Sequence, residues 1–90
     1  MAIARFKKDP DATLDYSFSW KKWLNGDTII DSEWIVEPGV TLEDETGSEV
    51  IRTAWVSGGT VGESYELTNR ITTAGGRIDD RTLILDCEER

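Results

Sequence analysis

Residues 65–85 read YELTNRITTAGGRIDDRTLIL, two runs of alternating side chains joined by a pair of glycines. Alternation with a period of two is typical of a half-buried β-strand, because successive side chains point to opposite faces. The pair Gly75-Gly76 predicts a tight turn between strands over residues 65–73 and 79–88, since glycine takes the positive φ that such turns need. This stretch therefore predicts a β-hairpin.

The register of the hairpin follows from which side chains must share a buried face. A two-residue loop would place Leu67 on one face and the leucines of the last strand on the other. A three-residue loop instead brings four large apolar side chains together. They are Tyr65, Leu67, Leu83 and Leu85. We therefore predict a loop of residues 74–76, with Gly76 in the left-handed conformation of a bulged turn.

The same alternation recurs upstream of the hairpin. Strands are predicted over residues 3–7, 14–20, 28–36, 40–42 and 50–56, with a polar, acidic loop over residues 43–49. About seven short antiparallel strands with turn signals every 8–12 residues or so are typical of an immunoglobulin-like β-sandwich. We predict an all-β fold of this kind, with residues 1–90 as a single domain. An open β-barrel is the competing architecture.

Two aromatic residues fit the immunoglobulin-like prediction. Tyr65 stands at the start of the penultimate strand, where such folds carry a corner tyrosine, and Trp34 lies on the third strand, where they bury a tryptophan. On that third strand we expect Ile30, Trp34 and Val36 to share one side, because they are separated by even numbers of residues.

The composition narrows the classes of partner. The chain has 10 Lys and Arg against 18 Asp and Glu, a formal net charge of −8 at pH 7. A field of this sign repels nucleic acid and anionic membranes, and the basic residues form only doublets. We therefore expect neither partner. The N-terminal residues lack the apolar run of a secretory signal, so we expect synthesis and retention in a cytoplasm unless lysis releases the protein.

Catalytic chemistry has little support in this sequence. It contains no histidine, and its one cysteine, Cys87, alternates with leucines and is predicted to be a small buried apolar residue. The carboxylates of residues 9–11 and 43–45 lack the ligand spacing of a calcium loop, so solvated turns are the preferred interpretation. Arg77 and Arg81 flank Asp79 and Asp80, so we expect cross-strand ion pairs here. We predict no enzyme, no cofactor and no metal.

The four tryptophans exceed what a thin core needs. Trp23 is predicted on a single helical turn over residues 20–24, and Trp55 on the less apolar face of its strand. Because tryptophan is enriched at interface hot spots, we predict both as protein-contact residues, with Lys21 and Lys22 beside the first. The alternative is that both rings pack beneath loops.

Three stretches carry a family resemblance. They are KDPDATLDYSFSWKKWL at residues 8–24, AWVSGGTVG at residues 54–62 and TNRITTAGGRIDDRTL at residues 68–83. Together they resemble a family of small tailed-bacteriophage proteins known as fiber–tail adaptors or virion structural proteins. The resemblance implies a non-enzymatic virion component, made in the host cytoplasm, that binds other phage tail or fiber proteins and transfers no catalytic residues.

Several functional readings remain open within that resemblance. An adaptor that joins tail fiber to tail is the first. A head decoration or connector protein is an alternative, and so is a host-surface carbohydrate-recognition module that uses exposed tryptophan. We expect an oligomer in the particle that is compatible with a monomer in dilute solution, because repeated weak contacts strengthen one another.

Overall fold

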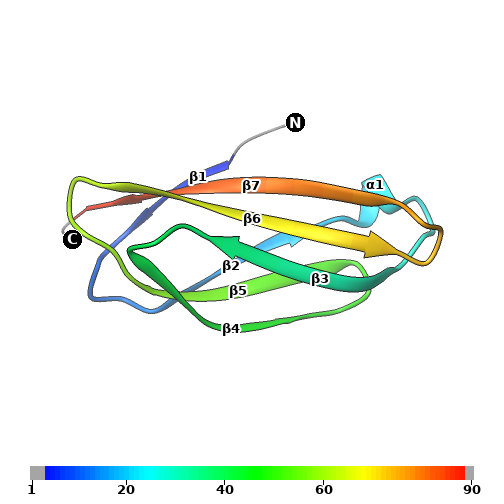
Figure 1. The fold of residues 1–90 in the computed structure, drawn as a ribbon, viewed down its shortest axis with the longest axis horizontal. Coiled ribbons are helices and arrows are strands. Elements are labelled where there is room, and N and C mark those ends of the chain that lie inside the picture. The colour runs from blue at the N-terminus through cyan, green and yellow to red at the C-terminus, as the bar shows by residue number, and fades with distance from the viewer. Residues whose placement is uncertain (1–3, 89–90) are drawn as a thin grey trace.

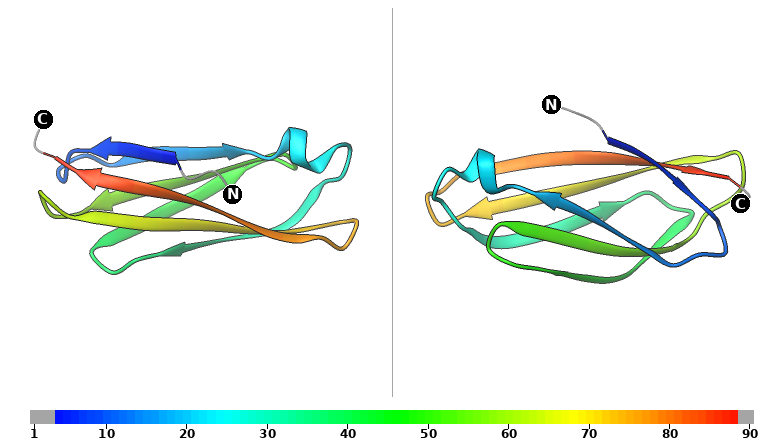
Figure 2. Two further views of the ribbon diagram at one scale, coloured as in Figure 1. Left: turned by 90° about the horizontal axis from the view of Figure 1, so that it is seen from above. Right: turned by 180° about the vertical axis from the view of Figure 1, so that it is seen from behind.

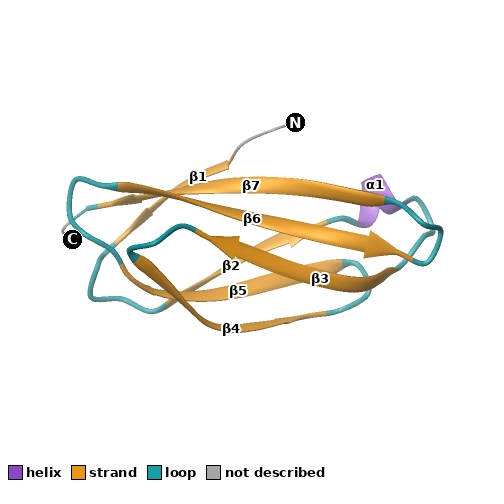
Figure 3. Ribbon diagram, viewed as in Figure 1, coloured by secondary structure: helices purple, strands orange, loops and turns teal. Residues whose placement is uncertain are grey.

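The computed structural model describes residues 4–88 as seven β-strands and one short helix, arranged in two packed sheets (Figures 1 and 3). The elements are β1 (Ala4–Lys8), β2 (Leu14–Ser19), α1 (Lys21–Leu24), β3 (Ile29–Val36), β4 (Val40–Gly47), β5 (Ile51–Gly58), β6 (Ser64–Thr73) and β7 (Ile78–Cys87). One sheet has the order β1-β7-β6-β3 and the other β2-β5-β4. The predicted all-β sandwich is confirmed, and the barrel alternative is wrong. Ile3, in the predicted first strand, lies outside the described residues.

The strand order follows the immunoglobulin pattern with one departure. β2-β5-β4 and β7-β6-β3 reproduce the two facing sheets of that fold, but β1 joins the second sheet beside β7 (Figure 2). β1 runs parallel to β7, from the pair Ala4↔Leu83 to the pair Lys8↔Cys87. The prediction of antiparallel pairing is wrong for this pair. No short connection links the first strand to the last, so a tight turn does not fix their relative direction.

The hairpin has the predicted register. Tyr65 pairs with Leu85 and Leu67 with Leu83, and all four side chains are buried. The loop has the predicted three residues, because the N–H of Thr73 donates to the carbonyl oxygen of Arg77 at 2.9 Å. Gly76 has φ = 87°, the left-handed conformation that the parity argument requires. The sharing of one apolar face was therefore sufficient to predict both register and turn.

Two adjoining apolar clusters fill the space between the sheets. The larger cluster comprises Tyr16, Trp34, Val40, Ala54, Val56, Tyr65, Leu67, Leu83, Leu85 and Cys87. A smaller cluster lies beneath α1 and comprises Trp20, Leu24, Ile29 and Ile71. The elongated shape, 42 × 23 × 19 Å, leaves only this thin double core. Cys87 is buried as predicted.

A β-bulge corrects the predicted face of the third strand. Ile30 was expected beside Trp34, but Ile30 is 66% exposed whereas Ile29 is buried. The pairing of β3 with β6 shifts register between Ile29 and Asp31. The extra residue of a bulge reverses which side chains point inward. Trp34, beyond the bulge, is buried as predicted.

The acidic segment 43–49 is mostly strand, not loop. β4 continues through Gly47 and pairs with β5, with a second bulge between Leu42 and Asp44. The side chains of residues 43–47 are exposed, so no apolar alternation marks the strand. Main-chain hydrogen bonds to β5 are enough to hold an edge strand, whatever its side chains. The prediction of a loop here is wrong for that reason.

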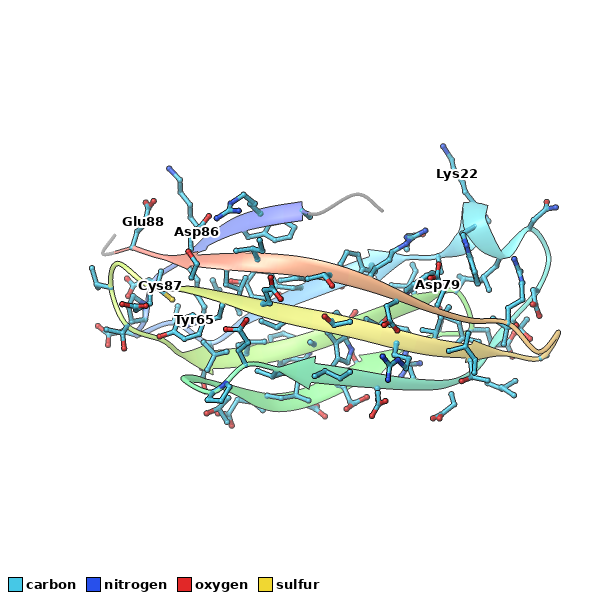
Figure 4. The ribbon with its side chains drawn as sticks, turned by 45° about the horizontal axis from the view of Figure 1, so that its top comes forward. Lys22, Tyr65, Asp79, Asp86, Cys87 and Glu88 are labelled. Atoms are coloured by element: carbon cyan, nitrogen blue, oxygen red, sulfur yellow. The ribbon has the colours of Figure 1, made fainter. Side chains whose placement is uncertain are left out.

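The predicted corner tyrosine is present at the end of the sandwich opposite α1 (Figure 4). The N–H of Thr60 donates to Tyr65 Oη at 3.0 Å, which ties the β5–β6 connection to the start of β6. Gly39 (φ = 113°) and Gly59 (φ = 104°) lie against the tyrosine ring. Figure 4 shows Tyr65 and Cys87 at this same end of the molecule.

Candidate protein-interaction surface

Trp20 anchors the chain where β2 leaves its sheet and α1 begins. Its side chain is fully buried, and its Nε1 donates to Asn69 Oδ1 at 3.0 Å. Asn69 is itself buried and donates through Nδ2 to Ser32 Oγ and to the carbonyl oxygen of Glu33. A buried polar network whose members all have partners holds its geometry closely. This network therefore fixes Trp20, and with it the start of α1.

Arg77 holds the C-terminal end of α1. Its guanidinium carbon lies 4.1 Å from the centre of the Trp23 ring. The same group donates to the carbonyl oxygens of Trp23 at 3.2 Å and Leu24 at 2.8 Å, at the C-terminal end of the helix. It also pairs with Asp27 at 3.2 Å. Arg77 thus combines a cation–π contact, helix capping and an ion pair.

Asp27 completes the link between the α1 turn and the hairpin loop. Hydrogen bonds from the Thr73 hydroxyl and from the N–H of Thr28 are the main causes that lower the pKa of Asp27 to about 2, from an ordinary 3.8. The N–H of Gly75 donates to the same carboxylate at 3.0 Å. The carboxylate is therefore charged at neutral pH and joins two segments that are distant in sequence.

The predicted contact residues on α1 differ in what they offer a partner. Trp23 is half-buried between Arg77 and the ring of Trp20, whose centroid lies 5.4 Å away in an edge-on arrangement. Lys21 and Lys22 are exposed and form no ion pair with any residue between 4 and 88. Figure 4 shows the Lys22 side chain extending away from the ribbon. This corner presents two free ammonium groups beside a fixed indole.

Trp55 lies on a different surface, the outer face of the β2-β5-β4 sheet. It is 38% exposed, in the middle of β5. Its cross-strand neighbours are Asp15 on β2 and Asp44 on β4, and both are exposed. The structure does not bring Trp55 and Trp23 together, because Trp55 pairs with Asp15 near the start of β2 whereas Trp23 follows the end of that strand. Trp55 and its two flanking carboxylates form what we call the Trp55 face.

On the outer face of the β1-β7-β6-β3 sheet, two aspartates form ion pairs with arginines. Arg70 pairs with Asp80 at 2.8 Å across the hairpin, and Arg5 with Asp86 at 2.9 Å. Hydrogen bonds from these arginines are the largest cause lowering the pKa of each aspartate. The predicted cross-strand ion pair exists for Asp80, although its partner is Arg70 and not the flanking Arg77 or Arg81. Asp79 forms no ion pair with any residue between 4 and 88. Asp80 and Asp86 have ion-pair partners, unlike the carboxylates of the Trp55 face.

Sequence reasoning missed Arg77 and Asp27 as organisers of this region. They are 50 residues apart, and both stand in polar turns where charged residues are ordinary. No local pattern distinguishes them from solvated turn residues. Only the fold, which places the hairpin loop beside α1, brings them together.

The described residues also bear on metal and membrane binding. Between residues 4 and 88, no three His, Cys, Asp or Glu side chains gather where they could hold a metal ion. None of the helical structure in this range has the length and apolar character to cross a bilayer.

Comparison with known proteins gives one positive finding. A family model described as podophage GP4 fiber-tail adaptor protein gp77 matches residues 8–86. The match runs from the last residue of β1 to the penultimate residue of β7, so it covers both sheets and α1. The resemblance identified in the sequence is confirmed. No curated protein matches the chain.

Proposed function

The chain belongs to the podophage GP4 fiber-tail adaptor family gp77, and on that premise we propose that it is a non-enzymatic virion protein that joins tail fiber to tail. The family match is the observation that carries this proposal, because it spans the sandwich from its first strand to its last. In this role the protein acts by binding other virion proteins after synthesis in the host cytoplasm.

The Trp55 face supplies the chemistry for such binding. An exposed indole buries a large area at little entropic cost, and it is among the residues most enriched at interface hot spots. Asp15 and Asp44 flank it without ion pairs to described residues. A partner surface that places Arg or Lys over the ring would gain a cation–π contact and two charge-assisted hydrogen bonds.

The residues also support a non-catalytic role. The sequence has no histidine, and the Cys87 thiol is buried with only 2% exposure. An accessible nucleophile with an adjacent base is the usual arrangement for covalent catalysis. The described surface offers instead paired charges on one face and an aromatic residue between carboxylates on the other.

Deletion of the gene in the phage tests the proposal. We expect particles that lack fibers while heads and tails remain assembled, with fibers restored by the wild-type gene supplied in trans. Electron cryo-microscopy of the particles is the measurement. Complete and infectious particles without the protein would rule the adaptor role out, and loss confined to the head would favour the decoration or connector alternative.

A carbohydrate-recognition role is the second candidate, and Trp55 is the observation that favours it. An exposed aromatic ring between two carboxylates can stack on a sugar and accept hydrogen bonds from its hydroxyls. Host glycans added to the purified protein would then change tryptophan fluorescence in the wild type but not in Trp55→Ala. If glycans cause no change in fluorescence and the deletion particles lack fibers, the carbohydrate role is excluded and the adaptor role is supported.

A further inference from the structure

A row of stacked side chains holds the end of the sandwich at which α1 lies (Figure 1). Arg77 lies over the ring of Trp23, and the guanidinium carbon of Arg81 lies 4.1 Å from the centre of the Trp20 ring. The two indoles contact each other edge-on. The contacts therefore form one continuous row with a guanidinium at each end. Because Trp20 is fully buried, this row fixes both guanidinium groups beside α1.

Among residues 4–88, Arg81 has hydrogen-bond donors that meet no acceptor. Its Nη1 donates to the carbonyl oxygen of Ser19 at 2.8 Å, and it forms no ion pair with any described residue. Arg70 and Arg5 show how the remaining donors can be used, because each places Nε and Nη2 on the two oxygens of one aspartate. On Arg81 the same two nitrogens have no partner in the described chain. A guanidinium stacked on a ring keeps its in-plane N–H groups available for a carboxylate.

Lys21 and Lys22 place two further cations beside Arg81. Both side chains are exposed, and neither ammonium group has an ion-pair partner between residues 4 and 88. They follow Trp20 directly in the chain, and Arg81 reaches the main chain of the residue before it. Figure 4 shows the Lys22 side chain extending away from the ribbon. Three cations that the described residues leave unpaired therefore gather around the start of α1.

The carboxylates near this end do not fully neutralise these cations. Asp27 already pairs with Arg77 at 3.2 Å. Asp79, two residues before Arg81 on β7, accepts a hydrogen bond from the next main-chain N–H and forms no ion pair within residues 4–88. The exposed Glu49, in the turn before β5, has no ion-pair partner in that range either. This end is therefore locally positive, on a chain whose formal net charge is −8. That contrast favours an acidic partner here.

An adaptor binds two different proteins, so it needs two surfaces that do not compete for one partner. The Trp55 face carries the exposed carboxylates of Asp15 and Asp44 and fits a basic partner. Asp15 lies near the start of β2, whereas α1 follows the end of that strand, so the two surfaces are separate. Their charges are opposite. A partner attracted by one surface is repelled by the other, which assigns each partner to its own site.

We propose that the α1 end, formed by Lys21, Lys22 and Arg81 around the two stacked indoles, binds an acidic segment of a second virion protein. One carboxylate lies on Nε and Nη2 of Arg81, as in the ion pairs of Arg70 and Arg5, and further carboxylates lie at the two ammonium groups. The inference rests on the adaptor function proposed above, and it adds the chemistry of the second partner. The Trp55 face then holds the basic partner.

Binding of the purified protein to each neighbour, measured separately, tests this site. The two probes are fiberless particles from the deletion phage and purified fibers, and we expect the wild type to bind both. Lys22→Glu should weaken binding to one neighbour by about fivefold or more and leave the other unchanged, because a like charge then faces the acidic segment. Lys7→Glu is the matched control, since Lys7 is also exposed but lies beside Asp86 at the opposite end of the molecule (Figure 4). It should bind both neighbours as the wild type does.

The free donors of Arg81 have a test of their own. Arg81→Lys keeps the positive charge but loses the planar pair of donors, so it should weaken binding to the same neighbour as Lys22→Glu does, by about threefold or more. Lys22→Arg keeps the charge and should bind as the wild type does. A variant that merely disturbed the fold would lose both neighbours.

Three outcomes would overturn the proposal and a fourth would reach further. Equal binding of both neighbours by Lys22→Glu and Lys7→Glu would remove the α1 site and leave the adaptor function standing. Weaker binding of Lys22→Glu to both neighbours alike, with an unchanged circular dichroism spectrum, would contradict the assignment of one partner to each surface. Binding of duplex DNA that is lost in Lys22→Glu would make the partner a nucleic acid. A wild type that bound neither neighbour would contradict the adaptor function itself.

Discussion

The guanidinium of Arg77 lies 4.1 Å over the ring of Trp23 and donates a hydrogen bond to the carbonyl oxygen of the same residue. One side chain from the β6–β7 loop therefore holds both the ring and the backbone of a four-residue helix. A helix of that length has no stability of its own in water. The orientation of Lys21 and Lys22 on α1 accordingly depends on Arg77.

Arg77→Ala should lower the free energy of unfolding by about 1–2 kcal/mol, through loss of the cation–π contact and of hydrogen bonds to two carbonyl groups. Arg77→Lys should recover little of it, because an ammonium cannot form the same planar fork. Urea denaturation followed by tryptophan fluorescence measures both. Arg70→Ala, which removes exposed ion pairs with Asp80 and Glu33, is the matched control and should cost under about 1 kcal/mol. If Arg77→Ala and Arg70→Ala lowered the free energy of unfolding equally, the role of Arg77 in holding α1 would be contradicted.

Stability should fall in acid partly because of Asp27. Its pKa in the folded protein is about 2, below the ordinary 3.8, so the unfolded chain binds the proton first as pH drops. The stabilisation is complete above pH 4 or so and is lost as pH falls towards 2. Asp27→Asn should flatten the fall in melting temperature across this window. Asp31→Asn, at an exposed position on β3, should keep the wild-type profile, and an unchanged Asp27→Asn profile would refute the assignment.

Leu85→Ala should cost about 2–4 kcal/mol, because Leu85 is fully buried opposite Tyr65 and the thin core cannot close the resulting cavity. Chemical denaturation monitored by circular dichroism is the measurement. Its neighbour Ile84 is only half-buried on the outer face, so Ile84→Ala should cost about 1 kcal/mol or less. A reversal of this order would mean that the hairpin faces are misassigned.

Gly59→Ala should destabilise the protein by about 1–3 kcal/mol, because an added Cβ would clash with Cys87 Sγ at a residue with φ = 104°. Gly26→Ala is the comparison, since Gly26 also has a positive φ but has nothing within 4 Å of an added Cβ. The difference between their unfolding midpoints isolates the clash from the backbone strain. Identical midpoints would show that Cys87 moves aside freely.

If Trp55 contacts a fiber or tail protein as proposed, Trp55→Ala should reduce binding to that partner by about tenfold or more, because exposed tryptophans are enriched at interface hot spots. The measurement is fiber occupancy on deletion particles supplied with the variant gene. Val61→Ala removes a comparably exposed apolar side chain, 54% accessible, from the β5–β6 connection. If both variants restore fibers fully, the contact lies elsewhere.

The parts of the fold that sequence predicted are those in which one buried face decides the answer. Tyr65, Leu67, Leu83 and Leu85 could share a face in only one parity, and so the loop length and the left-handed glycine followed. Burial of Trp34 and the corner role of Tyr65 were predicted from the positions at which immunoglobulin-like sandwiches carry these aromatic residues. Burial of alternate residues is a strong and local signal.

The errors arose where main-chain hydrogen bonding acts without burial. The bulges after Ile29 and Leu42 change the parity of a strand, and nothing in the side-chain pattern marks them. The acidic half of β4 is a strand only because β5 lies beside it. The same limit applies to the candidate surface: the tryptophans could be recognised as surplus, but Arg77 could be assigned to Trp23 only from the fold.

The parallel pairing of β1 with β7 has a mechanical consequence. The five residue pairs of this ladder join the beginning of the described chain to its end. A load that pulls the first residue of β1 and the last residue of β7 away from each other acts along both strands. All the hydrogen bonds between them then bear the load together, whereas an antiparallel pair pulled at its open end yields one bond at a time. If the protein joins fiber to tail as proposed and carries tension between these two residues, this pair of strands would resist the tension by shear.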